Sequence, residues 1–320
     1  AGVRPDDEVL VSSLSFIAPA NAVKYIGAWP VFIDAEPEFW QMDPNLVERF
    51  LVEECETRDG HMCNRRTGRR VTAILPAHIL GHPVDMDPIL DLARQYGLAV
   101  IEDAAESFGA KYKKRKVGAI ADVACLSFNG NKLITTGGGG MIVTNNEEWA
   151  DRARYLTTQA RDDETEYVHR EIGFNYRLTN IQAAIGCAQM ERIGKHISAK
   201  RRIARTYAQE LDEINGISLM REATWASAVF WLYTLRIDPD LFGMDSRALR
   251  RYLSAKGIRS RPLWQPLHIS PAFHGTQHVG GKIAETLWQE GLSIPCSVTI
   301  TKKERDAVVS AIKSASNGVG

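Results

Sequence analysis

Three segments between residues 102 and 140 place chemically useful side chains close together along the chain. Glu102–Glu106 (EDAAE) supplies carboxylates, Ser127–Lys132 (SFNGNK) supplies a hydroxyl and a primary amine, and Thr135–Gly140 (TTGGGG) supplies glycine backbone amides. A lysine amine can form an imine with a carbonyl carbon and afterwards carry a proton. Hydroxyls and the backbone amides of a glycine-rich turn can bind a phosphate group. The combination therefore indicates a site that handles a carbonyl group and a phosphate.

Each segment alone has an ordinary explanation. A single loop lysine is usually a solvated surface group, and an aspartate at a strand end is often a helix cap or a turn residue. The glycine run is not a P-loop, because no lysine-serine or lysine-threonine pair follows it. It is not a dinucleotide fingerprint either, because a strand follows it in place of a helix. A tight turn and a ligand-binding loop both stay open for this run.

Together, the three segments match the needs of a pyridoxal phosphate cofactor. Lys132 could form the imine and later move a proton, Asp103 could keep the pyridinium nitrogen protonated, and Ser127 could bind the phosphate. The order of these residues along the chain is more informative than any one of them.

The elements around these segments predict a mostly parallel sheet. Short apolar runs of strand character alternate with helical patterns through the first half of the chain. The expected strands are Glu8–Val11, Val31–Ile33, Val71–Leu75, Ala99–Ile101, Val123–Phe128 and Met141–Thr144, and the expected helices are Ala18–Gly27, Leu46–Val52 and Asp87–Tyr96. Apolar strands between helices are typical of a sheet that is covered on both faces. Such a sheet binds ligands beyond the carboxyl ends of its strands, so the three segments should share one crevice.

A second unit follows the first. Residues 179–211 should form one long helix or two, with a possible break near Gly194. A strand at Phe230–Ile237 and helices at Asp245–Ala255, Ile283–Glu290 and Lys302–Ile312 come after it. We therefore expect a large domain over residues 1–195 and a small domain over residues 196–320.

The charge balance excludes several kinds of partner. Among 320 residues, 39 lysines and arginines match 39 aspartates and glutamates, so no net field favours nucleic acid or an anionic membrane. The basic segment Lys111–Lys116 is more typical of a solvated turn than of a nucleic-acid-binding face, which needs a broad basic stripe.

The cysteines indicate a reducing compartment. The number is odd, with five in total, and the spacing is scattered, which argues against a disulfide framework. Cys55 and Cys63 flank His61 without the close cysteine pairs of structural zinc sites, so we predict no metal. Since no apolar run is long enough for a membrane span and the start carries no signal pattern, the cytoplasm is the expected location.

Three motifs resemble the signatures of a known enzyme family. They are Ile101–Ala110 (IEDAAESFGA), Ser127–Met141 (SFNGNKLITTGGGGM) and Gly173–Ala184 (GFNYRLTNIQAA). They are similar to those of the sugar aminotransferases of the DegT/DnrJ/EryC1/StrS group. Glu8–Asp34 and Arg261–His268 also fit, so the resemblance runs essentially from end to end. It implies an α/β fold of type I among the pyridoxal-phosphate-dependent transferases, with a mostly parallel sheet flanked by helices in the large domain and a smaller α+β C-terminal domain.

The resemblance also implies roles for single residues. Lys132 would carry the Schiff base with the cofactor and shuttle protons, Asp103 would pair with the pyridinium nitrogen, and Ser127 would bind the cofactor phosphate. Phe16 would stack on the cofactor ring; without the family, a core phenylalanine is as good an explanation. Glu106, where many members have glutamine, would lie near the ring hydroxyl and help proton traffic.

Two further implications concern assembly and reaction type. Asn175 would reach the cofactor phosphate of a neighbouring subunit, which implies a homodimer with shared active sites. A related branch of the group is a dehydratase with histidine in place of the lysine, so Lys132 indicates transamination.

Finer motifs resemble the enzymes of the bacillosamine and legionaminic acid pathways. This resemblance implies transfer of an amino group from glutamate to the C4 keto group of a UDP-linked 4-keto-6-deoxy-N-acetyl sugar. His169 and His268 could touch the substrate, although structural, hydrogen-bonded histidines explain them equally well. The motifs are Glu106, Phe128–Lys132, Thr157–Asp163 and His169–Gly173.

The start of the chain departs from the family pattern. Family members carry an additional N-terminal segment, with a helix start whose amides bind the cofactor phosphate, and we expect this part of the family domain to be missing. That expectation keeps an alternative open: a catalytically impaired cofactor-binding sensor or fragment of the same fold. A nicotinamide-linked oxidoreductase is disfavoured, because no dinucleotide fingerprint lies around Val9–Ala20.

Overall fold

A mostly parallel sheet lies at the centre of the N-terminal half. The computed structural model describes residues 1–163 and 165–317, and within them seven strands follow the order β10-β9-β6-β5-β1-β2-β15. Among these strands β10 runs antiparallel to β9, and the others pair in parallel. The strands are β1 (Glu8–Ser12), β2 (Trp29–Ile33), β5 (Val71–Leu75), β6 (Ala99–Asp103), β9 (Val123–Ser127), β10 (Gly140–Thr144) and β15 (His278–Val279). The sheet confirms the predicted architecture, and β1 is buried along its whole length because the sheet is covered on both faces.

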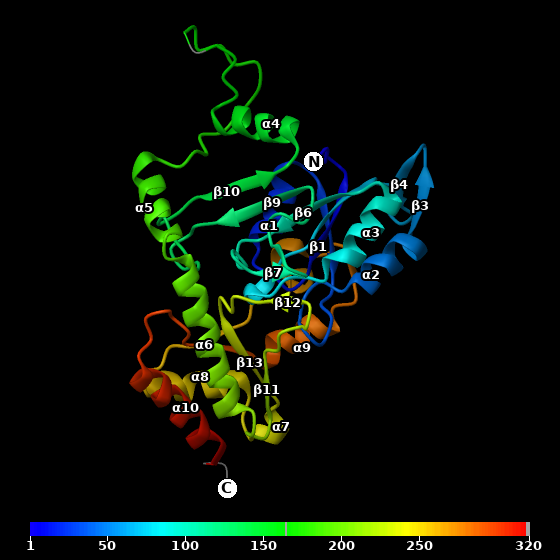
Figure 1. Ribbon diagram of the computed structural model, residues 1–320. Helices are drawn as coiled ribbons and strands as arrows, with labels where there is room; N and C mark the ends of the chain where they lie inside the picture. The colour runs from blue at the N-terminus through cyan, green and yellow to red at the C-terminus, as the bar shows by residue number, and fades with distance from the viewer. Residues whose placement is uncertain (164, 318–320) are drawn as a thin grey trace.

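Helices follow the strands of this sheet. In α3 the apolar side chains Met86, Ile89, Leu92 and Ala93 face the core, and the helix ends at Gly97 in the left-handed conformation. Figure 1 shows α2 and α3 side by side on one side of the sheet. The helices are α1 (Ala18–Tyr25), α2 (Pro44–Arg49) with a π-helical extension (Phe50–Glu54), α3 (Met86–Tyr96) and α4 (Glu147–Thr157). No helix in the described ranges is both long and apolar enough to cross a membrane.

Two further small sheets are separate from the large sheet. A hairpin pairs β3 (Cys55–Arg58) with β4 (His61–Asn64), and a second small sheet has the order β12-β7-β8. The basic segment 111–116 forms β7 (Lys111–Tyr112) and β8 (Arg115–Lys116), and its Lys113 and Arg115 both pair with Asp87. β12 is Ala226–Ser227.

The C-terminal half contains an antiparallel sheet packed against helices. Its strand order is β11-β13-β16-β14, with β11 (Ile217–Leu219), β13 (Tyr233–Ile237), β16 (Gly291–Ile294) and β14 (Arg261–Pro262). The predicted strand from residue 230 begins instead at Tyr233, because Phe230 has a φ of 49°, which an extended strand cannot contain. The other helices of the chain are α5 (Asn180–Met190), α6 (Ile193–Leu211), α7 (Pro239–Phe242), α8 (Ser246–Ala255), α9 (Lys282–Glu290) and α10 (Lys302–Asn317).

The region expected to hold one or two helices contains two. Thr179 caps the start of α5 and forms a capping box with Gln182. α5 ends at Met190 and α6 starts at Ile193, so the break lies just before the predicted position near Gly194.

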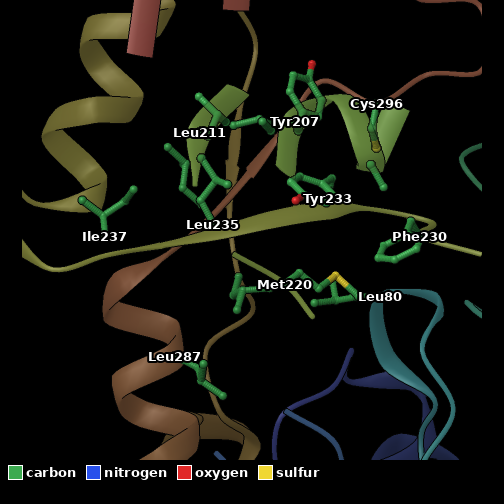
Figure 2. Packing of buried hydrophobic residues seen from close by; sticks show 14 of the residues in the cluster. Leu80, Tyr207, Leu211, Met220, Phe230, Tyr233, Leu235, Ile237, Leu287 and Cys296 are labelled. Atoms are coloured by element: carbon green, nitrogen blue, oxygen red, sulfur yellow. The ribbon is translucent and has the colours of Figure 1, made fainter. Parts of the chain in front are cut away.

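The two halves share a core and a sheet. Figure 2 shows Leu80, from the N-terminal half, among Met220, Phe230 and other buried residues of the C-terminal half. In addition, β15 extends the large sheet by pairing with β2. The C-terminal half is therefore placed firmly against the carboxyl ends of the parallel strands.

Candidate active site

A cavity of about 840 Å³ lies at the carboxyl ends of β6 and β9. Its walls include Phe16, Asp103, Glu106, Ser127 and Lys132. The structure thus brings five of the predicted site residues to one place, although they come from separate elements. The position agrees with the rule that parallel sheets bind ligands beyond the carboxyl ends of their strands.

Asp103 is the last residue of β6 and lies in the cavity wall. Its Oδ1 accepts a hydrogen bond from the backbone amide of Ala105 at 3.0 Å. In the described part of the chain, its Oδ2 accepts no hydrogen bond, so this oxygen is available to a ligand. Burial raises the pKa of Asp103, and the nearby charge of Lys132 opposes the rise.

Glu102, the neighbour of Asp103, has a structural position. It accepts hydrogen bonds from Nε2 of His78 at 3.0 Å and from the backbone amides of Gly118, Ile120 and Ala121 at 2.8 Å. Burial raises the pKa of Glu102, but these hydrogen bonds outweigh burial and leave the pKa below its ordinary value. Glu102 thereby fixes the loop that follows β8 to the end of β6.

Glu106 and Lys132 face each other inside the cavity. Nζ of Lys132 lies 3.7 Å from Oε1 of Glu106, whose Oε2 accepts a hydrogen bond from the backbone amide of Leu80 at 2.8 Å. Burial raises the pKa of Glu106 to about 7, although the charge of Lys132 lowers it. A carboxyl group with such a pKa can take up or release a proton beside the amine near neutral pH.

The turn after β9 fixes Lys132. Its backbone amide donates to the carbonyl of Asn129 at 3.0 Å, and its side chain is 13% exposed. Nζ lies 4.1 Å from the ring centroid of Trp231, and the indole N–H of Trp231 donates to the carbonyl of Asn131 at 2.8 Å. Sequence reasoning missed Trp231, since no motif signals a contact between such distant parts of the chain.

Ser127 and Phe16, the residues predicted to bind the phosphate and the ring, both line the cavity. Oγ of Ser127 accepts from the backbone amide of Asn129 at 3.3 Å, and both residues line the cavity. Phe16 lies two residues before the start of α1 and is 55% exposed, so its ring is accessible for stacking.

The glycine run 135–140 lies outside this wall. None of its residues is among the described residues that line the cavity. Gly137 and Gly139 have φ values of 81° and 88°, and the carbonyl of Gly139 accepts from the amide of Phe128. The run therefore forms a tight turn that leads into β10, and the expectation that its amides line this cavity is not met.

The structure places three predicted residues away from the cavity of their own chain. His169 and Asn175 are exposed on the segment between α4 and α5, which projects away from the rest of the molecule in Figure 1. Nδ1 of His169 contacts the carbonyl of Gln159 at 2.8 Å. His268 is buried, with Nδ1 2.6 Å from Oγ of Ser13 and Nε2 3.1 Å from Oε1 of Glu285.

The residues of the cavity fit pyridoxal phosphate. The cavity offers a nearly buried amine on Lys132, a carboxylate oxygen on Asp103 without a hydrogen bond from the described protein, and an accessible aromatic ring on Phe16. Its volume lies within the range of small-molecule sites, and its walls are mainly apolar with a few convergent polar groups.

Comparisons with known proteins agree with the geometry. The model of the DegT/DnrJ/EryC1/StrS aminotransferase family matches residues 1–313. A GDP-perosamine synthase of Caulobacter vibrioides is 40% identical over 97% of this chain and 80% of its own length. The putative pyridoxal-phosphate-dependent aminotransferase EpsN of Bacillus subtilis is 37% identical over 97% of this chain and 78% of its own length.

Solved structures give the same result. DesV of S. venezuelae superimposes with a TM-score of 0.86 at 31% identity, over 98% of this chain and 80% of the other. An aminotransferase from Brucella abortus gives 0.87 at 28% identity, with the same coverage. The chain therefore belongs to the DegT/DnrJ/EryC1/StrS aminotransferase family and is a pyridoxal-phosphate-dependent nucleotide-sugar aminotransferase of fold type I.

Proposed function

We propose that this chain uses Lys132 to transfer the amino group of glutamate to the C4 keto group of a nucleotide-linked 4-keto-6-deoxy-N-acetyl sugar. The observation that carries the proposal is the placement of the Lys132 amine, 3.7 Å from Glu106, in a cavity that Asp103 also lines. The finer substrate features come from the motif resemblance.

Different residues of the cavity would bind different parts of the cofactor. Among the lining residues, Asp103 would hold a proton on the ring nitrogen, Phe16 would cover a ring face, and Ser127 would bind the phosphate. When bound, pyridoxal phosphate withdraws electrons from the carbon next to the reacting amine. The half-buried carboxylate of Asp103 would support this withdrawal by keeping the ring nitrogen charged.

Lys132 and Glu106 handle the protons. The Lys132 amine, once free of the cofactor, takes a proton from the α-carbon of glutamate and later returns one to the sugar carbon. Glu106 lies close enough to the amine to stabilise its protonated form, and its pKa of about 7 lets it change protonation during turnover.

The first test separates catalysis from cofactor binding alone. The cofactor-loaded protein is mixed with glutamate in the absence of sugar, and released 2-oxoglutarate is counted per site. The wild type should release one equivalent, whereas Lys132→Ala should be slower by about three orders of magnitude or more. Lys116→Ala, at an exposed lysine, is the control and should behave as the wild type. Near-normal release by Lys132→Ala would refute the proposal, and no release by the wild type would favour a sensor that binds the cofactor without catalysis.

Two nucleotides, UDP and GDP, are candidates for the carrier of the sugar substrate. The motif resemblance indicates UDP, whereas relatives from Caulobacter vibrioides, Escherichia coli and Vibrio cholerae, at 32–40% identity, are named GDP-perosamine synthases. We therefore put UDP-linked and GDP-linked 4-keto-6-deoxy sugars to the same enzyme and compare kcat/KM. NMR of the product locates the new amine. Preference for GDP would replace UDP in the proposal, and an amine at another carbon would overturn the C4 assignment.

We further infer that the chain works as a homodimer whose Asn175 reaches the cofactor phosphate of the partner subunit. Asn175 is exposed and lies outside the cavity of its own chain. Residues near it in the sequence carry large apolar side chains that are open to water, with Ile172 89%, Tyr176 74% and Ile181 75% exposed. Large apolar side chains left exposed in one segment are often covered by a partner protein.

A further inference from the structure

Trp231 contacts the Lys132 amine from the C-terminal half of the chain. Its ring lies 4.1 Å from Nζ, on the cavity wall, and its indole N–H bonds to the carbonyl of Asn131, the residue before Lys132. Trp231 therefore contacts both the amine and the backbone that carries it. A tryptophan face attracts an ammonium group, so this contact restrains where the amine lies.

The backbone of Trp231 is held by a buried lysine, Lys200. Nζ of Lys200 donates to the backbone carbonyl of Trp231 at 2.7 Å and to Sγ of Cys296 at 3.3 Å. Trp231 and Lys200 are only 5% and 7% exposed. A buried lysine needs hydrogen-bond acceptors, and the Trp231 carbonyl is one of the acceptors of Lys200. This requirement favours a single position for the backbone at Trp231. On the cavity side, Trp264 stacks on Trp231 with ring centroids 6.5 Å apart and planes 6° apart.

The turn Ile79–Gly81 joins this contact to Glu106. The amide of Leu80 donates a hydrogen bond to Glu106, and the carbonyl of Gly81 accepts a hydrogen bond from the amide of Val229 at 2.8 Å. The backbone of Gly81 is so close to the 230–231 segment that an added Cβ would lie 2.6 Å from the amide nitrogen of Trp231. One turn therefore sets the positions of both groups that face the Lys132 amine.

We propose that Trp231 is a positioning residue that, with Glu106, holds the Lys132 amine at the point where it meets the cofactor aldehyde. We call Trp231, Glu106 and the turn 79–81 the lysine clamp. The inference rests on the proposed role of Lys132. A free lysine side chain loses rotamer entropy when it is fixed in one position. The lysine clamp removes part of this loss before the cofactor arrives, so attachment of the cofactor is faster.

The test compares covalent attachment with non-covalent binding. The rate at which cofactor-free protein attaches pyridoxal phosphate is followed by absorbance, and borohydride reduction with mass spectrometry identifies the modified lysine. Affinity for 4′-deoxypyridoxine phosphate, which has no aldehyde, is measured in parallel. Both are recorded at the pH where the wild-type attachment rate is highest.

We expect Trp231→Leu to slow attachment by roughly 10-fold or more, because misplacement of a reacting group by about 1 Å can cost about 100-fold in rate. The affinity for the deoxy analogue should change little. Trp231→Phe keeps a ring face but loses the bond to Asn131, and should give a smaller reduction. Trp149→Leu, a tryptophan substitution on α4 outside the cavity wall, is the control and should attach the cofactor at the wild-type rate. Lys200→Met loosens Trp231 without touching Lys132 and should also slow attachment.

The outcomes separate the inference from the proposed function. If the wild type does not attach the cofactor at Lys132, the proposed function fails and the inference fails with it. If the wild type attaches it and Trp231→Leu does so at the same rate, only the inference is overturned. Equal loss of attachment and of analogue binding would also overturn it, since that pattern indicates general damage to the cavity. Circular dichroism identifies any misfolded variant, and in that case Trp231→Phe and Lys200→Met decide.

Discussion

Glu106 links cofactor chemistry to stability at the scale of a single residue. It is 8% exposed and faces the Lys132 amine at 3.7 Å. Burial nevertheless raises its pKa from 4.5 to about 7, so desolvation outweighs the attraction. A carboxyl group in this position stores a proton in the folded protein that it would release in the unfolded chain.

The sign of this effect is testable with Glu106→Gln. Between pH 4.5 and about 7 the folded wild type binds a proton that the unfolded chain has lost, so its free energy of unfolding falls as the pH rises. The glutamine variant does not lose stability in this way, and its side-chain oxygen can still accept a hydrogen bond from the amide of Leu80. Its relative stability should therefore increase through this range and level off above it, by at most about 3 kcal/mol. Urea unfolding of cofactor-free protein across the pH range measures the difference.

The exposed carboxylate Glu148 provides the control for this experiment. Glu148→Gln should follow the wild-type profile, because surface substitutions have small effects on stability. Parallel profiles for Glu106→Gln and the wild type would show that burial does not raise the pKa of Glu106.

Residue types after strand ends were enough to predict which side chains meet in the cavity. Asp103 ends β6, and Ser127 and Lys132 lie at and after the end of β9, so a parallel sheet brings them together. The approach of Trp231 depends on the left-handed backbone at Phe230 and on the close contact with Gly81. Such a long-range steric fit leaves no local pattern, and for this reason the sequence did not reveal it.

At the scale of elements, the strongly apolar strands were predictable and the short ones were not. β5 was predicted with its observed bounds, because five apolar or β-branched residues end at Pro76. The two-residue strand β15 and the polar hairpin β3–β4 carry too few residues or too little alternation for a period to be recognised. His268, on a short helical turn, was equally ambiguous, because a histidine bonded to Ser13 has no distinct sequence signature.

The turn Ile79–Gly81 makes a sharp prediction at this scale. Gly81 has a φ of 90°, and a Cβ there would lie 2.6 Å from the amide nitrogen of Trp231 and 2.9 Å from that of Phe230. Gly81→Ala should therefore lower the free energy of unfolding by about 2–4 kcal/mol, since backbone strain and a steric clash add. Urea unfolding measures the loss.

Gly97→Ala separates the two causes. Gly97 also has a positive φ, at 66°, but a Cβ there would meet no atom within 4 Å. Gly97→Ala should therefore lower the free energy of unfolding by only about 1 kcal/mol. Equal losses in the two variants would mean that the contact between Gly81 and the 230–231 segment contributes nothing.

At the scale of the whole molecule, the exposed apolar residues of α5 bear on assembly. Ile181 and Ile185 are 75% and 43% exposed on this helix. The double variant Ile181→Asp/Ile185→Asp should shift the molar mass measured by light scattering from dimer to monomer, because charges would be buried in the interface. Leu241→Asp, on α7, is the control and should leave the mass unchanged. A wild-type monomer would contradict the proposed assembly.

Mixed subunits test whether the active sites are shared. If Asn175 serves the partner's cavity, a hybrid of Lys132→Ala and Asn175→Ala subunits contains one site with both residues intact. Random mixing of the two inactive parents should then restore about a quarter of wild-type activity. No recovery would place Asn175 and Lys132 in separate sites or in the same chain's site.

The edge strand β15 affects how the protein is made. It pairs with β2, although most of the chain lies between these two strands. A ribosome therefore releases β2 long before His278 and Val279 exist to cover it. Throughout that interval the nascent sheet presents an open edge to other chains, which is a known route to aggregation. We therefore expect the nascent chain to be most prone to aggregation during synthesis, and a translational pause before residue 278 should prolong that exposure without altering the finished fold.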